Sequence, residues 1–389
     1  MISPRPPSLP EPDADAREHS ARVVESVRAE IEHAGGWISF ARYMQRVLYA
    51  PGLGYYVAGA RKFGPAGDFV TAPETTPLFA QALAVQVAGI LAATATREIV
   101  EFGAGSGRLA ADLLNALARR DALPSRYAIV EVSPELRERQ RAAIALTAPD
   151  HVARVAWLDA LPATIDGAVV MNEVLDAVPP HILSRKNGEW FERGVVVGEP
   201  LRWEDRPLRD AVLRELAAER FPVTGDYVSE INPAAEALVE DVGRRLRAGA
   251  LLVLDYGFPQ AEYYHAQRSE GTLMGHFRHH AHADPFLWPG LSDLTAPVDF
   301  TAIALAGERA GMQVAGYAPQ AAFLLGCGIL DRLRECGEPT SVEYLRAAAA
   351  VHRLTSPAEM GELFKVLALA KCENVTWPGF AVADRSHRL

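Results

Sequence analysis

The sequence predicts an α/β protein with a central, mostly parallel sheet and helices on both of its faces. Short apolar runs alternate with helical stretches over residues 98–171, which is typical of consecutive βαβ units. Three glycines stand two apart in the segment EFGAGSG (101–107), where the first of these runs meets a helical pattern. The 389 residues exceed the size at which one hydrophobic core stops growing, so we expect additions to this main domain.

Seven segments are predicted to be the strands of this sheet. Each is short and mainly apolar, and the first three are separated by stretches with helical periodicity at 107–120 and 134–146. The last strand is expected to run antiparallel. The predicted strands are 98–102, 127–132, 153–157, 167–171, 250–255, 312–318 and 362–370.

The segments outside these strands are predicted to form a disordered tail, a helical cap and inserts on the substrate side. The first twenty residues are acidic and rich in proline, a composition typical of disorder. The predicted division begins with a tail at 1–20 and a helical cap with a lid strand at 21–93. The first half of the sheet domain follows at 94–172, and then an insert at 173–248 with a hairpin (181–185 and 190–197) and two helices (207–219 and 233–247). The second half of the sheet domain, at 249–372, contains a polar substrate loop at 258–299 and a helical insert at 320–354, and a tail at 373–389 ends the division.

Composition excludes several classes of protein. A net charge of −10 argues against a nucleic-acid partner, because surfaces that bind nucleic acid are strongly basic. Three cysteines without CxxC spacing indicate reduced thiols rather than a disulfide scaffold or a zinc site. The most apolar run, 82–95, is too short to cross a bilayer, and residues 1–20 resemble neither a secretory signal nor a transit peptide. We therefore expect a cytoplasmic protein without membrane insertion, whose oligomeric state is left open.

The glycine turn is typical of a nucleotide-cofactor site. Missing side chains let the backbone approach a ligand, and the following helix offers free N–H groups to an anion. The residues from Gly105 to Ala110 fit the dinucleotide pattern GxGxxG/A, which favours an NAD(P)-dependent oxidoreductase. The residues from Glu101 to Gly107 equally fit E/D-x-G-x-G-x-G, the first motif of methyltransferases that use S-adenosylmethionine. A tight turn without a ligand is the third alternative.

Polar side chains follow the next strands of the predicted sheet. Glu131 closes the second strand, where a carboxylate can accept hydrogen bonds from both hydroxyls of a ribose. Asp159 follows the third strand and can reach an adenine amino group or, alternatively, cap a helix. Asn172, Glu173 and Asp176 follow the fourth strand, at the carboxyl edge where open α/β sheets bind ligands.

Seven segments of the chain together resemble the MidA-like family. They occur in the family's order over residues 21–372, and such a set is far more specific than the glycine turn alone. The segments are GDFVTAPE (67–74), EFGAGSG (101–107), EVSPELRERQ (131–140), NEVLDAVP (172–179), DYGF (255–258), SDLTAPVDF (292–300) and MGELFKVL (360–367).

This resemblance implies a class I methyltransferase (Rossmann-like) fold, S-adenosyl-L-methionine as the cofactor, and methylation of an arginine on a protein partner. The mitochondrial members of the family are complex I assembly factors, held to dimethylate an arginine symmetrically on the subunit beside the quinone site. The reading of the chain as a non-catalytic assembly factor that binds the cofactor remains an alternative.

The resemblance also implies roles for individual residues. The three glycines would contact the methionine part of the cofactor, with Glu101 near its amino group and Glu131 at the ribose. A lid strand would cover the cofactor. The implied cofactor-binding residues, with those expected from their place at the sheet edge, are Glu101, Gly103, Gly105, Gly107, Glu131, Asp159 and Asn172, and the lid is formed by Gly67, Asp68 and Phe69.

A carboxylate in bidentate contact with an acceptor guanidinium would fix the plane of the guanidinium and draw off its proton. Glu173 is the first candidate for this catalytic role, with Asp176 in support. In the alternative interpretation, Glu173 binds the cofactor's amino group or caps the following helix. NEVLDAVP offers only one glutamate, whereas the familiar arginine methyltransferases use two on one loop.

The histidine-rich stretch 267–290 is predicted to be a mobile loop that orders over the cofactor and the incoming peptide. The spacing of His276, His279, His280 and His282 can also bring two imidazoles to one metal ion. No HExxH motif or nearby cysteine supports a metal, so none is predicted. The candidate substrate residues are Arg268, Glu270 and His276, with Asp255 and Tyr256 of the DYGF segment; a surface ion pair is the alternative for Arg268 and Glu270.

Overall fold

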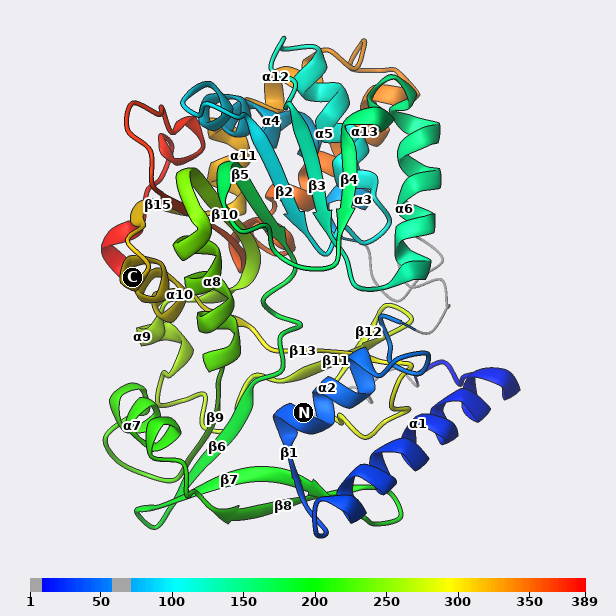
Figure 1. Cartoon of the computed structure of the whole chain (residues 1–389), viewed down its shortest axis with the longest axis vertical. Helices are drawn as coiled ribbons and strands as arrows, with labels where there is room; N and C mark the ends of the chain where they lie inside the picture. Colours follow the sequence, from blue (N-terminus) through cyan, green and yellow to red (C-terminus); the bar gives the residue numbers. More distant parts are fainter. Residues whose placement is uncertain (1–8, 58–70) are drawn as a thin grey trace. The chain divides into compact units, whose positions relative to one another are not determined.

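The computed structural model describes residues 9–57 and 71–389 (Figure 1). These residues form two compact units, and each unit is built from three stretches of the chain. The second unit contains the predicted central sheet and comprises Thr71–Val178, Asn232–His265 and Pro297–Leu389. The first unit comprises the described residues up to 57 together with Pro179–Ile231 and Ala266–Ala296.

The sheet of the second unit has the predicted α/β architecture. Strands β2, β3, β4, β5 and β10 run parallel, whereas β16 is antiparallel to both of its neighbours, β10 and β15. The seven predicted strands are present, and a further strand, β14, pairs with β10. The sequence does not predict β14, because two residues are too few to show a hydrophobic period. The spatial order is β15 (Gln313–Pro319), β16 (Phe364–Ala370), β10 (Leu246–Phe258), β5 (Ile165–Asn172), β2 (Glu98–Phe102), β3 (Arg126–Val130) and β4 (Val155–Leu158), with β14 (Val298–Asp299) beside β10.

Helices cover both faces of this sheet (Figure 1). In β2, Ile99 belongs to one buried hydrophobic cluster and Val100 to the other, because successive side chains of a strand point to opposite faces. Residues of α4 and α5 fill the first cluster, and residues of α8 and α10 fill the second. The helices are α3 (Ala72–Thr75), α4 (Pro77–Ala92), α5 (Arg108–Ala118), α6 (Pro134–Thr147), α8 (Pro233–Arg245), α9 (Gln260–Tyr263), α10 (Phe300–Arg309), α11 (Gln320–Gly326), α12 (Ile329–Arg334), α13 (Val342–Thr355) and α14 (Met360–Leu363).

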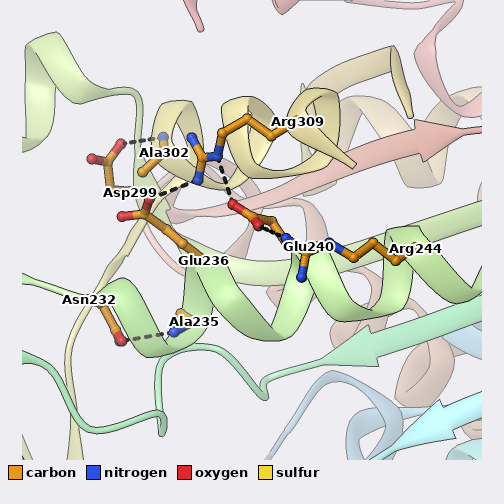
Figure 2. A network of polar contacts seen from close by, with 8 residues as sticks. All are labelled: Asn232, Ala235, Glu236, Glu240, Arg244, Asp299, Ala302 and Arg309. Atoms are coloured by element: carbon orange, nitrogen blue, oxygen red, sulfur yellow. Dashed lines mark hydrogen bonds and ion pairs between the residues drawn. The ribbon is translucent and has the colours of Figure 1, made fainter. Parts of the chain in front are cut away.

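Polar contacts join the neighbouring helices α8 and α10 (Figure 2). Each helix begins at a side-chain cap, Asn232 for α8 and Asp299 for α10, whose oxygen accepts a backbone N–H three residues on. The Arg309 guanidinium bonds Glu236 at 3.2 Å and Glu240 at 2.6 Å, one helical turn apart on α8. Because Arg309 is half exposed, this bridge fixes the register of the two helices more than it adds stability.

The first unit is built around antiparallel strands. Its larger sheet follows the order β1 (Ile38–Ser39), β7 (Glu189–Val196), β6 (His181–Lys186) and β9 (Tyr227–Ile231), with β8 (Arg202–Pro207) beside β7. A small sheet has the order β12 (His280–His282), β11 (Met274–Phe277) and β13 (Asp293–Thr295). The helices of this unit are α1 (Ala14–His33), α2 (Phe40–Tyr49) and α7 (Ala211–Arg220), and the apolar faces of α1 and α2 share one buried cluster with strands β1, β6 and β7.

The structure departs from the predicted organisation in its terminal segments and in the unit to which two helices belong. Helix α1 begins at Ala14, inside the segment expected to be disordered, because Asp13 caps it and Ser20 is buried against the Pro289 carbonyl. The stretch 258–299, predicted to be too long for a plain loop, contains the short helix α9 and the strands β11, β12 and β13. The helices at 77–92 and 233–245 belong to the unit that holds the central sheet, not to the predicted cap and insert.

The C-terminal residues, expected to be a tail, also pack against the second unit. Phe380 is 5% exposed and its ring centroid lies 5.4 Å from that of Phe323. The ring lies directly over Gly316, where an added Cβ would fall 2.2 Å from a Phe380 ring carbon. The end of the chain therefore completes the hydrophobic core on this side of the sheet.

Truncation of this ring should destabilise the protein. Phe380→Ala leaves a cavity in the core and is expected to lower the free energy of unfolding by about 3 kcal/mol, measured by urea denaturation. Val382→Ala, two residues on and 58% exposed, is the matched control and should change it by less than about 0.5 kcal/mol. Equal, small effects of the two substitutions would contradict a packed C-terminus.

Candidate active site

The glycine turn lies at the carboxyl end of β2, directly before α5. Gly103, Gly105 and Gly107 all have positive φ (56°, 53° and 84°), a conformation that other residues rarely adopt. A Cβ on Gly107 would lie 2.9 Å from the Cα of Gln140 on α6, so a side chain has no room there. The turn therefore presents bare backbone and the N-terminal N–H groups of α5, as a cofactor site requires.

Glu131 lies just beyond the end of β3, next to this turn. Its Oε1 accepts the backbone N–H of Ser133 at 2.9 Å, and its Oε2 accepts the side-chain amide of Gln140 at 3.1 Å. The Gln140 amide also donates to the carbonyl of Gly105 at 3.1 Å. Each carboxylate oxygen thus keeps a lone pair for a further donor, such as a ribose hydroxyl.

Gln140 itself was not among the predicted site residues. The signal in the sequence is its place on α6: Leu136, Gln140 and Ile144 recur every four residues and are the buried positions of that helix. A glutamine on an apolar helical stripe needs polar partners inside the protein. Its partners are not visible in the sequence.

Asp159 follows β4 and carries a 91% exposed side chain that pairs with Arg137 at 2.6 Å. Arg137 also donates to the carbonyls of Glu131 and Leu158, so it joins the ends of β3 and β4. No helix of the described chain begins at Asp159, and the cap alternative is therefore wrong. Contact with an adenine amino group stays a prediction.

Glu101 is buried within β2 and is 2% exposed. The Tyr127 hydroxyl donates to its Oε2 at 2.8 Å. Burial raises the pKa of Glu101 to about 7, an effect that the Tyr127 hydrogen bond opposes. Its predicted place near the cofactor's amino group stays a prediction.

Glu173 follows β5 at the carboxyl edge of the sheet, with a positive φ of 54°. Its Oε1 accepts the backbone N–H of Ala72 at 3.3 Å and the side-chain amide of Asn172 at 3.1 Å. Burial raises the pKa of Glu173 to about 7, against the effect of these two donors. The next residue, Val174, lies 3.5 Å from where a Cβ on Gly103 would be, so this carboxylate and the glycine turn are neighbours.

Asp255 holds the turn that carries Glu173. Its Oδ2 accepts the backbone N–H groups of Val174, Leu175 and Asp176 at 3.0–3.3 Å, and its Oδ1 accepts that of Tyr256 at 2.9 Å. Burial, followed by the nearby Glu173, raises the pKa of Asp255. With its side chain fully buried, Asp255 positions the turn and has no surface for a substrate, in contrast to its predicted role.

Asp176 and Tyr256 flank this arrangement. Asp176, predicted to support Glu173, is 7% exposed, and its backbone N–H donates to Asp255 Oδ2 at 3.3 Å. The ring of Tyr256, a predicted substrate residue, lies 5.8 Å from that of Phe364. Asn172, a predicted cofactor residue, donates to Glu173, and its contact with the cofactor stays a prediction.

The other predicted substrate residues lie in the first unit. Glu270 forms an isolated parallel bridge with Val228, and Arg268 lies close enough to Tyr227 to lower its pKa, which burial raises overall to about 12. Burial and then the neighbouring His282 lower the pKa of His276 on β11. Within residues 9–57 and 71–389, no three His, Cys, Asp or Glu side chains are grouped so that they could hold a metal ion.

Two further predictions concern the lid and the membrane. Gly67, Asp68 and Phe69 lie outside the described residues. Among the helices that the structure describes, none combines the length and the apolar character needed to cross a bilayer.

Comparison with known proteins assigns the cofactor. Residues 82–318 match a family model described as "Putative S-adenosyl-L-methionine-dependent methyltransferase". A structure from Burkholderia thailandensis with bound S-adenosyl-homocysteine is 51% identical, with a TM-score of 0.94, and covers 98% of this chain and 100% of that one. The cofactor is therefore S-adenosylmethionine, and the nicotinamide alternative is set aside; contact of the glycine turn with this cofactor stays a prediction.

Curated relatives are more distant but cover most of the chain. Protein arginine methyltransferase NDUFAF7 of Mus musculus is 30% identical over 371 residues, covering 86% of this chain and 81% of the relative. Its Homo sapiens counterpart is 30% identical over 377 residues, covering 86% and 80%. With its parallel sheet, its glycine turn and these matches, the chain belongs to the MidA-like family of S-adenosyl-L-methionine-dependent methyltransferases.

Proposed function

We propose that this methyltransferase is a protein arginine N-methyltransferase that forms symmetric dimethylarginine on a respiratory complex I-type subunit or another protein partner. The observation that carries the proposal is the Glu173 carboxylate. Its Oε1 is fixed by two donors, while no described residue donates to its Oε2. A fixed carboxylate whose second oxygen accepts from none of the described residues is suited to orient a guanidinium.

The residues of the second unit fit the cofactor. The bare backbone from Gly103 to Gly107 leaves room for its methionine part, and Glu131 offers one lone pair on each oxygen to the ribose hydroxyls. Val132, 70% exposed directly after Glu131, offers an apolar surface to a flat base. When bound, S-adenosylmethionine supplies an electrophilic methyl group on a sulfonium.

Glu173 would handle the proton of the acceptor. A guanidinium stays protonated throughout the working range, with a pKa above about 12, so its nitrogen must lose a proton as the new N–C bond forms. A hydrogen bond to Glu173 Oε2 directs one guanidinium nitrogen toward the carboxylate and gives that proton a place to go. Burial of Glu173 favours this transfer, since it raises the affinity of the carboxylate for a proton.

Two further observations support an arginine-bearing partner. The mouse and human relatives are named protein arginine methyltransferases. The net charge of −10 favours the approach of a cationic segment, because a negative surface attracts positive substrates.

The proposal is tested by methyl transfer to matched peptides. Peptides spanning the arginines of the complex I subunit beside the quinone site are incubated with tritiated S-adenosylmethionine, each beside a twin with lysine in place of arginine. We expect label only in arginine peptides, recovered as symmetric dimethylarginine after hydrolysis. Label in the lysine twins would contradict the proposal, and binding of the partner without any label would leave the assembly-factor alternative.

Glu173→Gln keeps the shape of the side chain but removes the proton acceptor. It is expected to lower kcat by about 100-fold or more at saturating cofactor, with the affinity for S-adenosylhomocysteine within about threefold of wild type. Glu343→Gln, on the exposed side of α13, is the control and should change neither quantity. Full turnover of Glu173→Gln would remove Glu173 from the mechanism.

Activity should also depend on pH through this carboxylate. The pKa of Glu173 is raised to about 7, and only the deprotonated form can accept the proton. We therefore expect kcat/KM to fall about tenfold per pH unit below pH 7 and to level off above it. A profile of kcat/KM that is flat from pH 6 to 8, with unchanged cofactor affinity, would exclude Glu173 as the base.

A further inference from the structure

We propose that Gln140 is a positioning residue for the cofactor: its side chain holds Glu131 and the glycine turn in the arrangement that recognises the ribose. This inference concerns the cofactor site and is independent of the acceptor. It rests on a set of hydrogen bonds within the second unit.

The NH₂ group and the carbonyl oxygen of the Gln140 side chain make three hydrogen bonds, each to a residue of, or directly after, a different strand. Its amide nitrogen donates to the Gly105 carbonyl and to Glu131 Oε2, both at 3.1 Å. Its amide oxygen accepts the indole N–H of Trp157 at 2.8 Å. Because Gln140 is fully buried, water cannot replace any of these partners. One side chain therefore connects the turn after β2, the carboxylate after β3 and strand β4.

Trp157 fixes which way the amide faces. An indole N–H can only donate, so it must meet the amide oxygen. The NH₂ group is thereby directed toward Gly105 and Glu131, where both of its hydrogens are used. Trp157 is held in turn by the Arg141 guanidinium, 4.6 Å from the centre of its ring.

The hydrogen bonds to Glu131 leave one lone pair on each carboxylate oxygen to accept from a ligand. Ser133 donates to one carboxylate oxygen and Gln140 to the other. With both oxygens tethered, the plane of the carboxylate is fixed, and the lone pairs left over have fixed directions. Two vicinal hydroxyls need this geometry, whereas a ligand that lacks one hydroxyl needs it less.

The backbone of Gln140 adds a second constraint. Its Cα is the atom that a side chain at Gly107 would strike, at 2.9 Å. The backbone of Gln140 thus excludes a side chain at residue 107, while its amide donates to the turn at Gly105. We infer that loss of the amide loosens the turn and Glu131 together.

The experiment measures binding by calorimetry with two probes, S-adenosylhomocysteine and its 2′-deoxy analogue. Gln140→Met keeps the volume and removes the hydrogen bonds; we expect S-adenosylhomocysteine to bind about 10- to 100-fold more weakly. The deoxy analogue, which cannot use the full ribose contact, should lose less than about threefold. An affinity for S-adenosylhomocysteine equal to wild type, or equal losses for both probes, would overturn the proposal.

Gln86 supplies a matched control. It is likewise a fully buried glutamine on a helix of the second unit, and its amide bonds the Thr376 carbonyl and the Gly379 N–H instead. Gln86→Met should lower stability without changing the affinity for either probe. Weaker binding by this variant, to the same extent as Gln140→Met, would mean that general destabilisation explains both and would overturn the proposal.

Gln140→Glu gives a signature that a merely structural role would not produce. It places a second carboxylate against Glu131, and two such groups at hydrogen-bond distance cannot both stay ionised. When a proton is shared between them, residue 140 can again donate to Glu131, so the affinity of this variant should rise as the pH falls from 8 to 6. A pH response identical to wild type would contradict the inference.

If Gln140→Met fails to fold, Trp157→Phe keeps the test open. It removes the donor that orients the amide while preserving an aromatic ring. We expect the selectivity for S-adenosylhomocysteine over its deoxy analogue to drop about threefold to tenfold. Unchanged selectivity in the folded Trp157→Phe protein would overturn the proposal.

Discussion

The close approach of α6 to the glycine turn is the constraint on which the cofactor side of this protein depends. A side chain at Gly107 would meet the Cα of Gln140 at 2.9 Å, so the turn must be bare where the helix passes. The same approach brings the Gln140 amide to Gly105 and Glu131. Glycines, carboxylate and amide therefore form one structural arrangement, although each belongs to a different segment of the sequence.

The proposed acceptor site is built on two buried carboxylates, Glu173 and Asp255. Burial raises the pKa of both carboxylates, and Glu173 raises that of Asp255 further. Glu173 also has a backbone conformation that is unfavourable for a residue with a side chain. Four backbone N–H groups donate to Asp255, which partly offsets the cost of burying its charge and holds the turn after β5 in place. Such an arrangement contributes little to stability, and perturbed carboxylates of this kind are typical of functional sites.

Different parts of this protein indicate its cofactor and its proposed acceptor. The parallel sheet with its bare first turn is a framework shared by methyltransferases with many substrates, so it identifies the cofactor and not the acceptor. The acceptor has to be inferred from the Glu173 carboxylate, at the end of the neighbouring strand β5, and from the two groups that donate to it. The two conclusions can therefore be tested separately.

Much of the fold and part of the site could be predicted because their signals are local. A strand such as 98–102 is a short apolar run, a glycine turn is read from consecutive residues, and Glu131 stands out because it closes the strand after that turn. The seven motifs together also identified the family, since each is a short run of neighbouring residues.

The sequence by itself thus determined the sheet, the cofactor and the carboxylates at the strand ends. Only the tertiary structure decided which partners those groups have: Gln140 meets Gly105 across 35 residues, and Asp255 meets Val174 across 81. It likewise decided that Phe380 is core and that α1 begins at Ala14. The physical reason is that hydrophobic periodicity specifies which face of an element is buried, whereas a hydrogen bond between distant segments depends on how the elements pack.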